Sequence, residues 1–186
     1  MEYAQGEIGG NMLSYWAYIL IGNNDTGKTS FQKHLVSDLC NLQYQRLPRN
    51  FLTDITHPRM PRGVATLSTM NRSYQEKIVD YGDVASFFQS HFKEADICIL
   101  SSHAHTPSID HVRDMIRELR RRAYNVAAVF FSNGYNNEAA EISLLDWDER
   151  LWLDNPPLEQ EAAIQSQIAR LANEFAHLLI ARATIL

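Results

Sequence analysis

The segment Gly22–Thr29 constrains this chain most. It reads Gly-Asn-Asn-Asp-Thr-Gly-Lys-Thr and therefore fits the pattern G-x-x-x-x-G-K-[ST]. The apolar run Tyr15–Ile21 stands before it, and its aromatic and β-branched residues predict a strand buried on both faces. Lys28–Cys40 follows, with apolar residues recurring at helical spacing. A strand, a glycine-bearing turn and a helix form the setting in which this pattern cradles phosphate groups.

Each residue type in the segment has a chemical reason to be there. Gly22 and Gly27 allow a tight turn that brings backbone N–H groups onto phosphate oxygens. The helix starting at Lys28 directs its positive end to the same anion, and the lysine neutralises the outer phosphates. Thr29 offers a hydroxyl to Mg²⁺. The remaining candidate contacts are Asn23, Asn24, Asp25, Thr26 and Ser30; we expect Asp25 to face solvent or to cap the helix.

Composition limits the class of protein. The 186 residues carry a net charge of -5, which excludes a general attraction to nucleic acid or anionic membrane. Two cysteines are too few for a disulfide framework, so we expect a reduced, cytoplasmic protein. We expect a single domain over residues 1–186, with neither signal peptide nor membrane anchor, because the longest apolar stretch is too short to span a bilayer.

Strand and helix patterns alternate along the rest of the chain. Expected strands are Val64–Met70, Glu76–Val79, Ile97–Leu100, Val126–Phe131 and a short Ile142–Leu145. Expected helices are Val84–Phe92, one starting at Thr106-Pro107 and one starting at Asn155-Pro156-Pro157. Buried strands alternating with helices predict an α/β fold, the three-layer αβα arrangement of P-loop NTPases, with a mostly parallel sheet. The expected strands Val64–Met70 and Glu76–Val79 are close in sequence, and they predict a hairpin that adds one antiparallel edge strand.

A second element is needed to orient Mg²⁺, usually a carboxylate at the end of a neighbouring strand. Such a carboxylate is present in the segment Lys77-Ile78-Val79-Asp80-Tyr81-Gly82-Asp83: if Glu76–Val79 is a strand, Asp80 stands at its end. Asp80 is then the metal-side and catalytic carboxylate, together with Lys28, and the N–H of Gly82 approaches the terminal phosphate. A strand-ending Asp before Gly is also an ordinary turn.

These features resemble small Ras-like GTPases over roughly residues 15 to 136. Ala17–Gly22 and Gly27-Lys28-Thr29-Ser30 are similar to the family's first strand and phosphate loop, and the expected hairpin leads into Asp80-Tyr81-Gly82 as its second and third strands do. The resemblance implies a Mg²⁺-dependent switch that binds GTP, hydrolyses it and meets a protein activator or effector. The MinD/ParA ATPases show a similar order and match less well.

The chain departs from the family's motifs in three places. Asp80-Tyr81-Gly82 is one residue shorter than D-x-x-G, and Asp83 replaces the glutamine that orients the attacking water. Asn133-Gly134-Tyr135-Asn136 stands where guanine is read, and an Asn at the last position suits adenine's edge as well as guanine's. The base, GTP or ATP, is left open, and so is a plain polar turn at Asn133–Asn137. Thr66 and Thr69 are both candidates for the switch threonine that binds the metal.

Three functions are consistent with these motifs. The first is a Ras-like switch with slow hydrolysis, in which the Pro- and Arg-rich segment Arg46–Arg62 closes over the terminal phosphate. The second is a small-molecule phosphotransferase (a kinase) with Asp80 or Asp83 as base. The third is a nucleotide-dependent assembly protein with little turnover. His103, His105 and His111 lie close in sequence, but no cysteine or carboxylate completes a metal-ligand set.

Overall fold

A six-stranded sheet forms the centre of the protein, whose computed structural model describes residues 15–184. The strands lie in the order β2-β3-β4-β1-β5-β6, and every neighbouring pair is parallel except β2 and β3. Their bounds are β1 Trp16–Ile21, β2 Asn50–Asp54, β3 Thr66–Met70, β4 Ile97–Ser102, β5 Asn125–Phe131 and β6 Glu149–Leu153. The expected α/β fold with a mostly parallel sheet and one antiparallel edge strand is confirmed.

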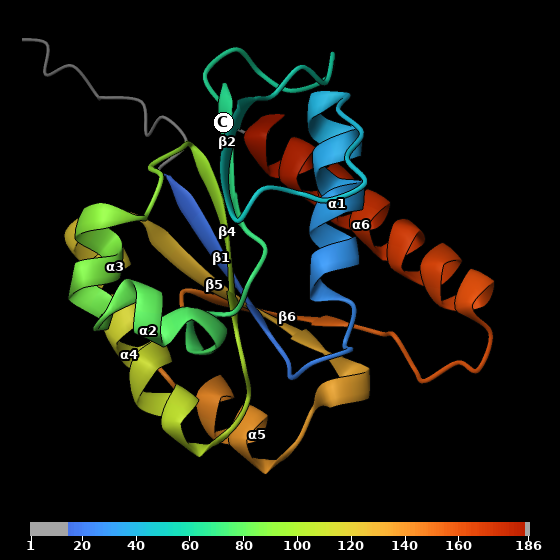
Figure 1. The fold of residues 1–186 in the computed structure, drawn as a ribbon. Coiled ribbons are helices and arrows are strands. Elements are labelled where there is room, and N and C mark those ends of the chain that lie inside the picture. The colour runs from blue at the N-terminus through green and yellow to red at the C-terminus, as the bar shows by residue number, and fades with distance from the viewer. Residues whose placement is uncertain (1–14, 185–186) are drawn as a thin grey trace, which may run out of the picture.

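Helices cover both faces of this sheet. Their bounds are α1 Lys28–Cys40, α2 Ile78–Tyr81, α3 Val84–Ser90, α4 Thr106–Arg121, α5 Asn137–Ser143 and α6 Glu161–Thr184. Figure 1 shows α1 and α6 on one side of the sheet and α3 and α4 on the other. Alternate residues of β1 serve the two sides: Tyr18 and Leu20 pack with α1 and α6, and Ile19 and Ile21 pack with α3 and α4. Within residues 15–184, no helix has the length and apolar character needed to cross a membrane.

The antiparallel edge strand comes from a segment that the sequence pattern predicted to be irregular. β2 pairs with β3 from Asn50 opposite Met70 to Asp54 opposite Thr66. The proline-rich stretches on either side of β2 mask its short alternating pattern, and eleven intervening residues, 55–65, replace the tight turn of an ordinary hairpin.

The expected strand Glu76–Val79 is wrong. Tyr74–Lys77 forms a 3-10 helix (η1), and α2 follows it directly. Ser73 and Glu76 stand at the two positions of a capping-box sequence, and Glu76 accepts from the Ser73 N–H (3.4 Å); this helix-start signal outweighs the short apolar pair Ile78-Val79. Both of those apolar residues are exposed, Val79 at 95%, whereas Tyr74 is buried.

Two further predictions near the end of the chain are wrong. Ile142 and the residues before it belong to α5, whose start is capped by the Asn136 side chain, and the last strand is β6. The final helix begins at Glu161 rather than at the two prolines, and residues 154–160 form an irregular connection that crosses the carboxyl edge of the sheet.

Candidate phosphate-binding site

Residues 22–29, the connection from β1 together with the first two residues of α1, lie at the carboxyl edge of the parallel strands, where open α/β sheets usually bind ligands. We call them the 22–29 loop. Thr26 Oγ1 donates to the carbonyl oxygen of Asn23 (2.9 Å), which closes a tight turn. Asp25 is exposed to solvent, one of its two expected placements, and has a left-handed backbone (φ 62°).

Gly27 ends the turn in a conformation that other residues rarely adopt (φ 96°). A Cβ atom there would lie 2.6 Å from Cδ1 of Ile168 on α6, so the loop is also pressed against that helix. Gly27 stands at the N-cap position of α1, where it offers no side-chain acceptor. Among residues 15–184, the N–H groups of the first helical turn therefore have neither an intrahelical nor a capping side-chain partner.

Neighbouring loops hold the 22–29 loop in place through side-chain amides. Asn23 exchanges two hydrogen bonds with the backbone of Ala104, one to its carbonyl oxygen (3.2 Å) and one from its N–H (2.9 Å). The wholly buried Asn155 donates to the carbonyl oxygen of Thr26 (3.2 Å). The loop is thus tied to the segments that follow β4 and β6.

The Lys28 ammonium folds back into the loop and is only 8% exposed. It donates to the carbonyl oxygens of Gly22 and Asn23, the latter at 2.8 Å. Burial lowers the pKa of Lys28 to about 8, although Glu76 and Asp25 act in the opposite direction. A cation in this position has dipolar partners and no ion pair among residues 15–184.

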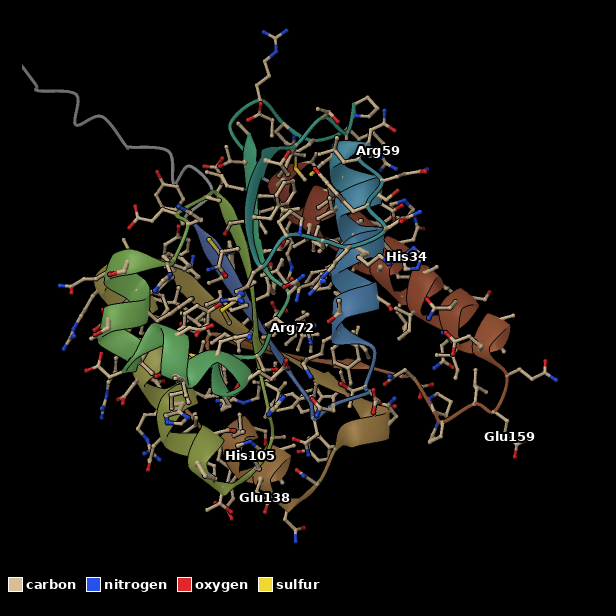
Figure 2. All side chains as sticks on the ribbon, in the orientation of Figure 1. His34, Arg59, Arg72, His105, Glu138 and Glu159 are labelled. Atoms are coloured by element: carbon tan, nitrogen blue, oxygen red, sulfur yellow. The ribbon has the colours of Figure 1, made fainter. Side chains whose placement is uncertain are left out.

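A pocket of about 670 Å³ opens in front of the loop. Its walls come from the loop and first turn of α1, the segment after β3, and the start of α6; the lining residues are Asn24–Ser30, Asn71, Arg72, Glu76, Glu161, Ile164, Gln165 and Ile168. Figure 2 shows Arg72 beside the first turns of α1. The negative charge of Glu76 acts on Lys28 across this space and favours the charged form of the lysine.

Glu76 is the carboxylate that lines the pocket from the β3 side, and the sequence analysis missed it. Its Oε2 accepts from Arg72 (3.2 Å) and its Oε1 lies 3.3 Å from His103 Nε2. Burial alone would raise the pKa of Glu76, but the Ser73 N–H, His103 and Arg72 outweigh burial and lower it. Gln75 fixes the segment by donating to Ser102 Oγ (3.0 Å). The carboxylate is therefore ionised at neutral pH and accepts hydrogen bonds.

Asp80, Gly82 and Asp83 lie elsewhere. Asp80 does not end a strand; it belongs to α2, pairs with Arg49 (2.9 Å) and does not line the pocket of the 22–29 loop. The N–H of Gly82 donates to Ile78 (2.9 Å), and so it is not free to approach a phosphate. Asp83 caps α3 by accepting from the Ser86 N–H (2.7 Å). The strands beside β1 are β4 and β5, and neither ends in a carboxylate.

Thr66 is at the wrong edge of the sheet for the metal role considered for it. It begins β3, and its hydroxyl and N–H both donate to Asp96 (2.8 Å each). Thr69 lies further along β3 and is buried. Because β3 runs parallel to β4 and β4 to β1, Thr66 lies at the amino edge and the 22–29 loop at the carboxyl edge.

The oxygen atoms around Thr29 are of the kind that suits Mg²⁺. The Thr29 hydroxyl donates to the carbonyl oxygen of Asn71 (3.0 Å), and the buried Asn71 Oδ1 accepts no hydrogen bond from the described residues. Residues 15–184 contain no group of three His, Cys, Asp or Glu side chains placed to hold a metal. Neutral oxygens with the Glu76 carboxylate nearby fit Mg²⁺, which keeps waters and takes phosphate oxygens as its other ligands.

Asn133 and Asn136 follow β5 and have different surroundings. Asn136 uses both ends of its amide inside the protein, donating to Ala104 (2.9 Å) and accepting from the Ala139 N–H (2.8 Å). Asn133 lines a smaller pocket of about 160 Å³ with Asn155 and residues 156–158. This pocket adjoins the 22–29 loop through Asp25–Gly27.

The histidines form a hydrogen-bonded row that leads away from Glu76. His103 Nδ1 lies 3.3 Å from His105 Nε2, and His105 Nδ1 lies 3.0 Å from Ser108 Oγ at the start of α4. Burial, with Lys28 nearby, lowers the pKa of His103. The row supports the Glu76 side of the pocket rather than forming a separate centre.

Neither a protein-family model nor a curated protein sequence matches the chain. Since these comparisons with known proteins give no match, the geometry of the site is the basis for a proposal of function.

Proposed function

We propose that this protein binds a Mg²⁺–nucleoside triphosphate with its phosphates on the 22–29 loop. The buried Lys28 ammonium carries the proposal. It lies inside a loop of the right sequence, at the uncapped start of α1, and has no ion pair among the described residues. Burial without a counter-ion lowers its pKa to about 8, and a polyphosphate would supply the missing charge.

The residues have separate roles in this proposal. Lys28 turns from the loop carbonyls to the outer phosphates, and the first-turn N–H groups of α1 bind the inner ones. Thr29 and Glu76 line the same pocket and would supply oxygen donors to Mg²⁺ or to its bound waters. Bound Mg²⁺ would neutralise charge on the phosphate oxygens.

A Ras-like switch with slow hydrolysis is the first candidate for the activity of the nucleotide-bound protein. Slow turnover is expected because no glutamine stands after Gly82 and because Asp80 and Asp83 are engaged in α2 and at the start of α3. Glu76, held by Arg72 and His103, is one group in the pocket that can orient a water molecule.

The nucleotide is GTP or ATP. Its base contacts Asn133 and residues 155–158, which line the smaller pocket. The Asn136 amide already makes one hydrogen bond at each end inside the protein, which favours Asn133 over Asn136 as the base contact.

A small-molecule phosphotransferase is the second candidate. One observation favours it: a basic pocket of about 270 Å³ adjoins the pocket of the 22–29 loop and shares Asn71, Arg72 and Glu76 with it. A pure hydrolase has no need of such a space, whereas a transferase needs an acceptor site. Phosphate release that is independent of any added acceptor would favour the switch.

Equilibrium titration with Mg²⁺–GTP and Mg²⁺–ATP tests the proposal. Wild-type protein should bind one of them at one site per chain, and Lys28→Met should weaken binding by at least about 100-fold, because charge-assisted hydrogen bonds to phosphate are lost. Lys33→Ala is the matched control: this lysine is on the same helix and lies outside the pocket. Absence of binding, or equal affinity for the Lys28 and Lys33 variants, would refute it.

A further inference from the structure

The basic pocket is lined by cations from three stretches of chain. Arg46 and Arg49 precede β2, Arg72 follows β3, and Lys77 ends η1; Asn71 and Glu76 complete the lining. β2 is antiparallel to β3, so its first residue lies opposite the last residue of β3 and brings Arg49 to the carboxyl edge. Four cations thus converge on a space of about 270 Å³.

These cations are not balanced locally. Glu76 pairs with Arg72 (3.2 Å), and Asp80 is shared between Arg49 (2.9 Å) and Lys77 (3.9 Å). Arg46 has no ion pair within residues 15–184. Two carboxylates against four cations leave a local excess of positive charge in a chain whose net charge is -5, so general basicity does not explain the cluster.

The present ion pairs can yield to a ligand. The side chains of Arg49 and Arg72 are 46% and 48% exposed, and exposed pairs of this kind contribute little to stability. Guanidinium groups present donors in a fork that matches two oxygens of a phosphate. The space takes a phosphate group with a small organic part, since typical small-molecule pockets start at about 300 Å³.

We infer that the basic pocket binds the phosphate monoester group of a second small molecule. No residue of the 22–29 loop lines this pocket, which separates it from the phosphates held by Lys28. The shared wall of Asn71, Arg72 and Glu76 places the rest of the second molecule next to the outer phosphate of a bound nucleotide. Its use as an acceptor rests on the proposed nucleotide binding, whereas its binding to the basic pocket does not.

Calorimetric titration with glycerol 3-phosphate, without Mg²⁺, tests this inference. The free protein should bind one equivalent, and protein saturated with a non-hydrolysable GTP or ATP analogue should still bind it. Arg46→Gln with Arg72→Gln should weaken the affinity at least tenfold. Arg59→Gln should change it less than twofold, because Arg59 is outside the pocket and lies near the other end of α1 from Arg72 (Figure 2).

Lys28→Met separates the two proposals. It should keep glycerol 3-phosphate binding while losing nucleotide, so a protein that binds no nucleotide can still be tested for the basic pocket. Three results would overturn the inference: no saturable binding to wild-type protein, loss of binding when the nucleotide analogue is present, or an Arg59→Gln effect as large as that of the double variant. Unchanged thermal unfolding midpoints would exclude a folding defect in the exposed arginine variants.

Discussion

Titration of Lys28 gives a sharp prediction for the nucleotide-free protein. Its pKa falls from 10.5, the ordinary value, to about 8 because the ammonium is buried. At about 1.4 kcal/mol per pH unit, the difference corresponds to roughly 3 kcal/mol of destabilisation while the side chain is charged in both states. Below pH 8 the folded protein bears this full cost.

The sign follows from proton binding. Between pH 8 and pH 10.5 the unfolded chain keeps the Lys28 proton and the folded protein has lost it, so the free energy of unfolding rises with pH. Other lysines and tyrosines also titrate in this range. Their effects cancel when wild-type protein is compared with Lys28→Met at each pH.

Urea unfolding at a series of pH values measures the effect. The free energy of unfolding of wild-type protein, minus that of Lys28→Met, should increase by about 3 kcal/mol from pH 8 to pH 10.5. A bound triphosphate should abolish this increase, because a partnered ammonium keeps its proton over the whole range. A difference that stays constant with pH would refute the argument that burial without a counter-ion destabilises this lysine.

Two other predictions concern the frame of the loop. In urea unfolding, Gly27→Ala should destabilise the protein by at least about 1–2 kcal/mol, because a φ of 96° is strained for alanine and the new Cβ atom meets α6. Gly63→Ala is the control: no atom lies within 4 Å of its new Cβ atom, so it should be nearly neutral. Asn155→Ala should cost about 2 kcal/mol and weaken nucleotide binding, since the buried amide holds the Thr26 carbonyl oxygen; the exposed Asn173→Ala is its control, and equal effects of the two would contradict this role for Asn155.

The sequence predicted the parts of the fold that depend on local patterns. β1 and α1 follow from an apolar run, a helical stripe and the motif between them, and the starts of α1 and α4 are as expected. Glu76 could have been found from the capping box Ser73-x-x-Glu76, which marks a helix start where the strand was expected. The expected strand Glu76–Val79 put Asp80 in the wrong setting, because Ile78 and Val79 are exposed residues of a helix.

The rest depends on tertiary structure. No local pattern reveals that β4 lies between β3 and β1, and this order decides which residues stand beside the 22–29 loop. Asn155 is 129 residues from Thr26, its partner, and an asparagine before two prolines is ordinary in sequence. The basic pocket likewise forms only when β2 pairs with β3 and carries Arg49 to the carboxyl edge.

A crystal structure with Mg²⁺ and a non-hydrolysable nucleoside triphosphate tests the central claim most directly. We predict that Lys28 Nζ leaves the carbonyl oxygens of Gly22 and Asn23 and lies about 3 Å from the outer phosphates, with the inner ones on the first turn of α1. A triphosphate bound away from the 22–29 loop, or a Lys28 ammonium still on those carbonyls, would contradict it.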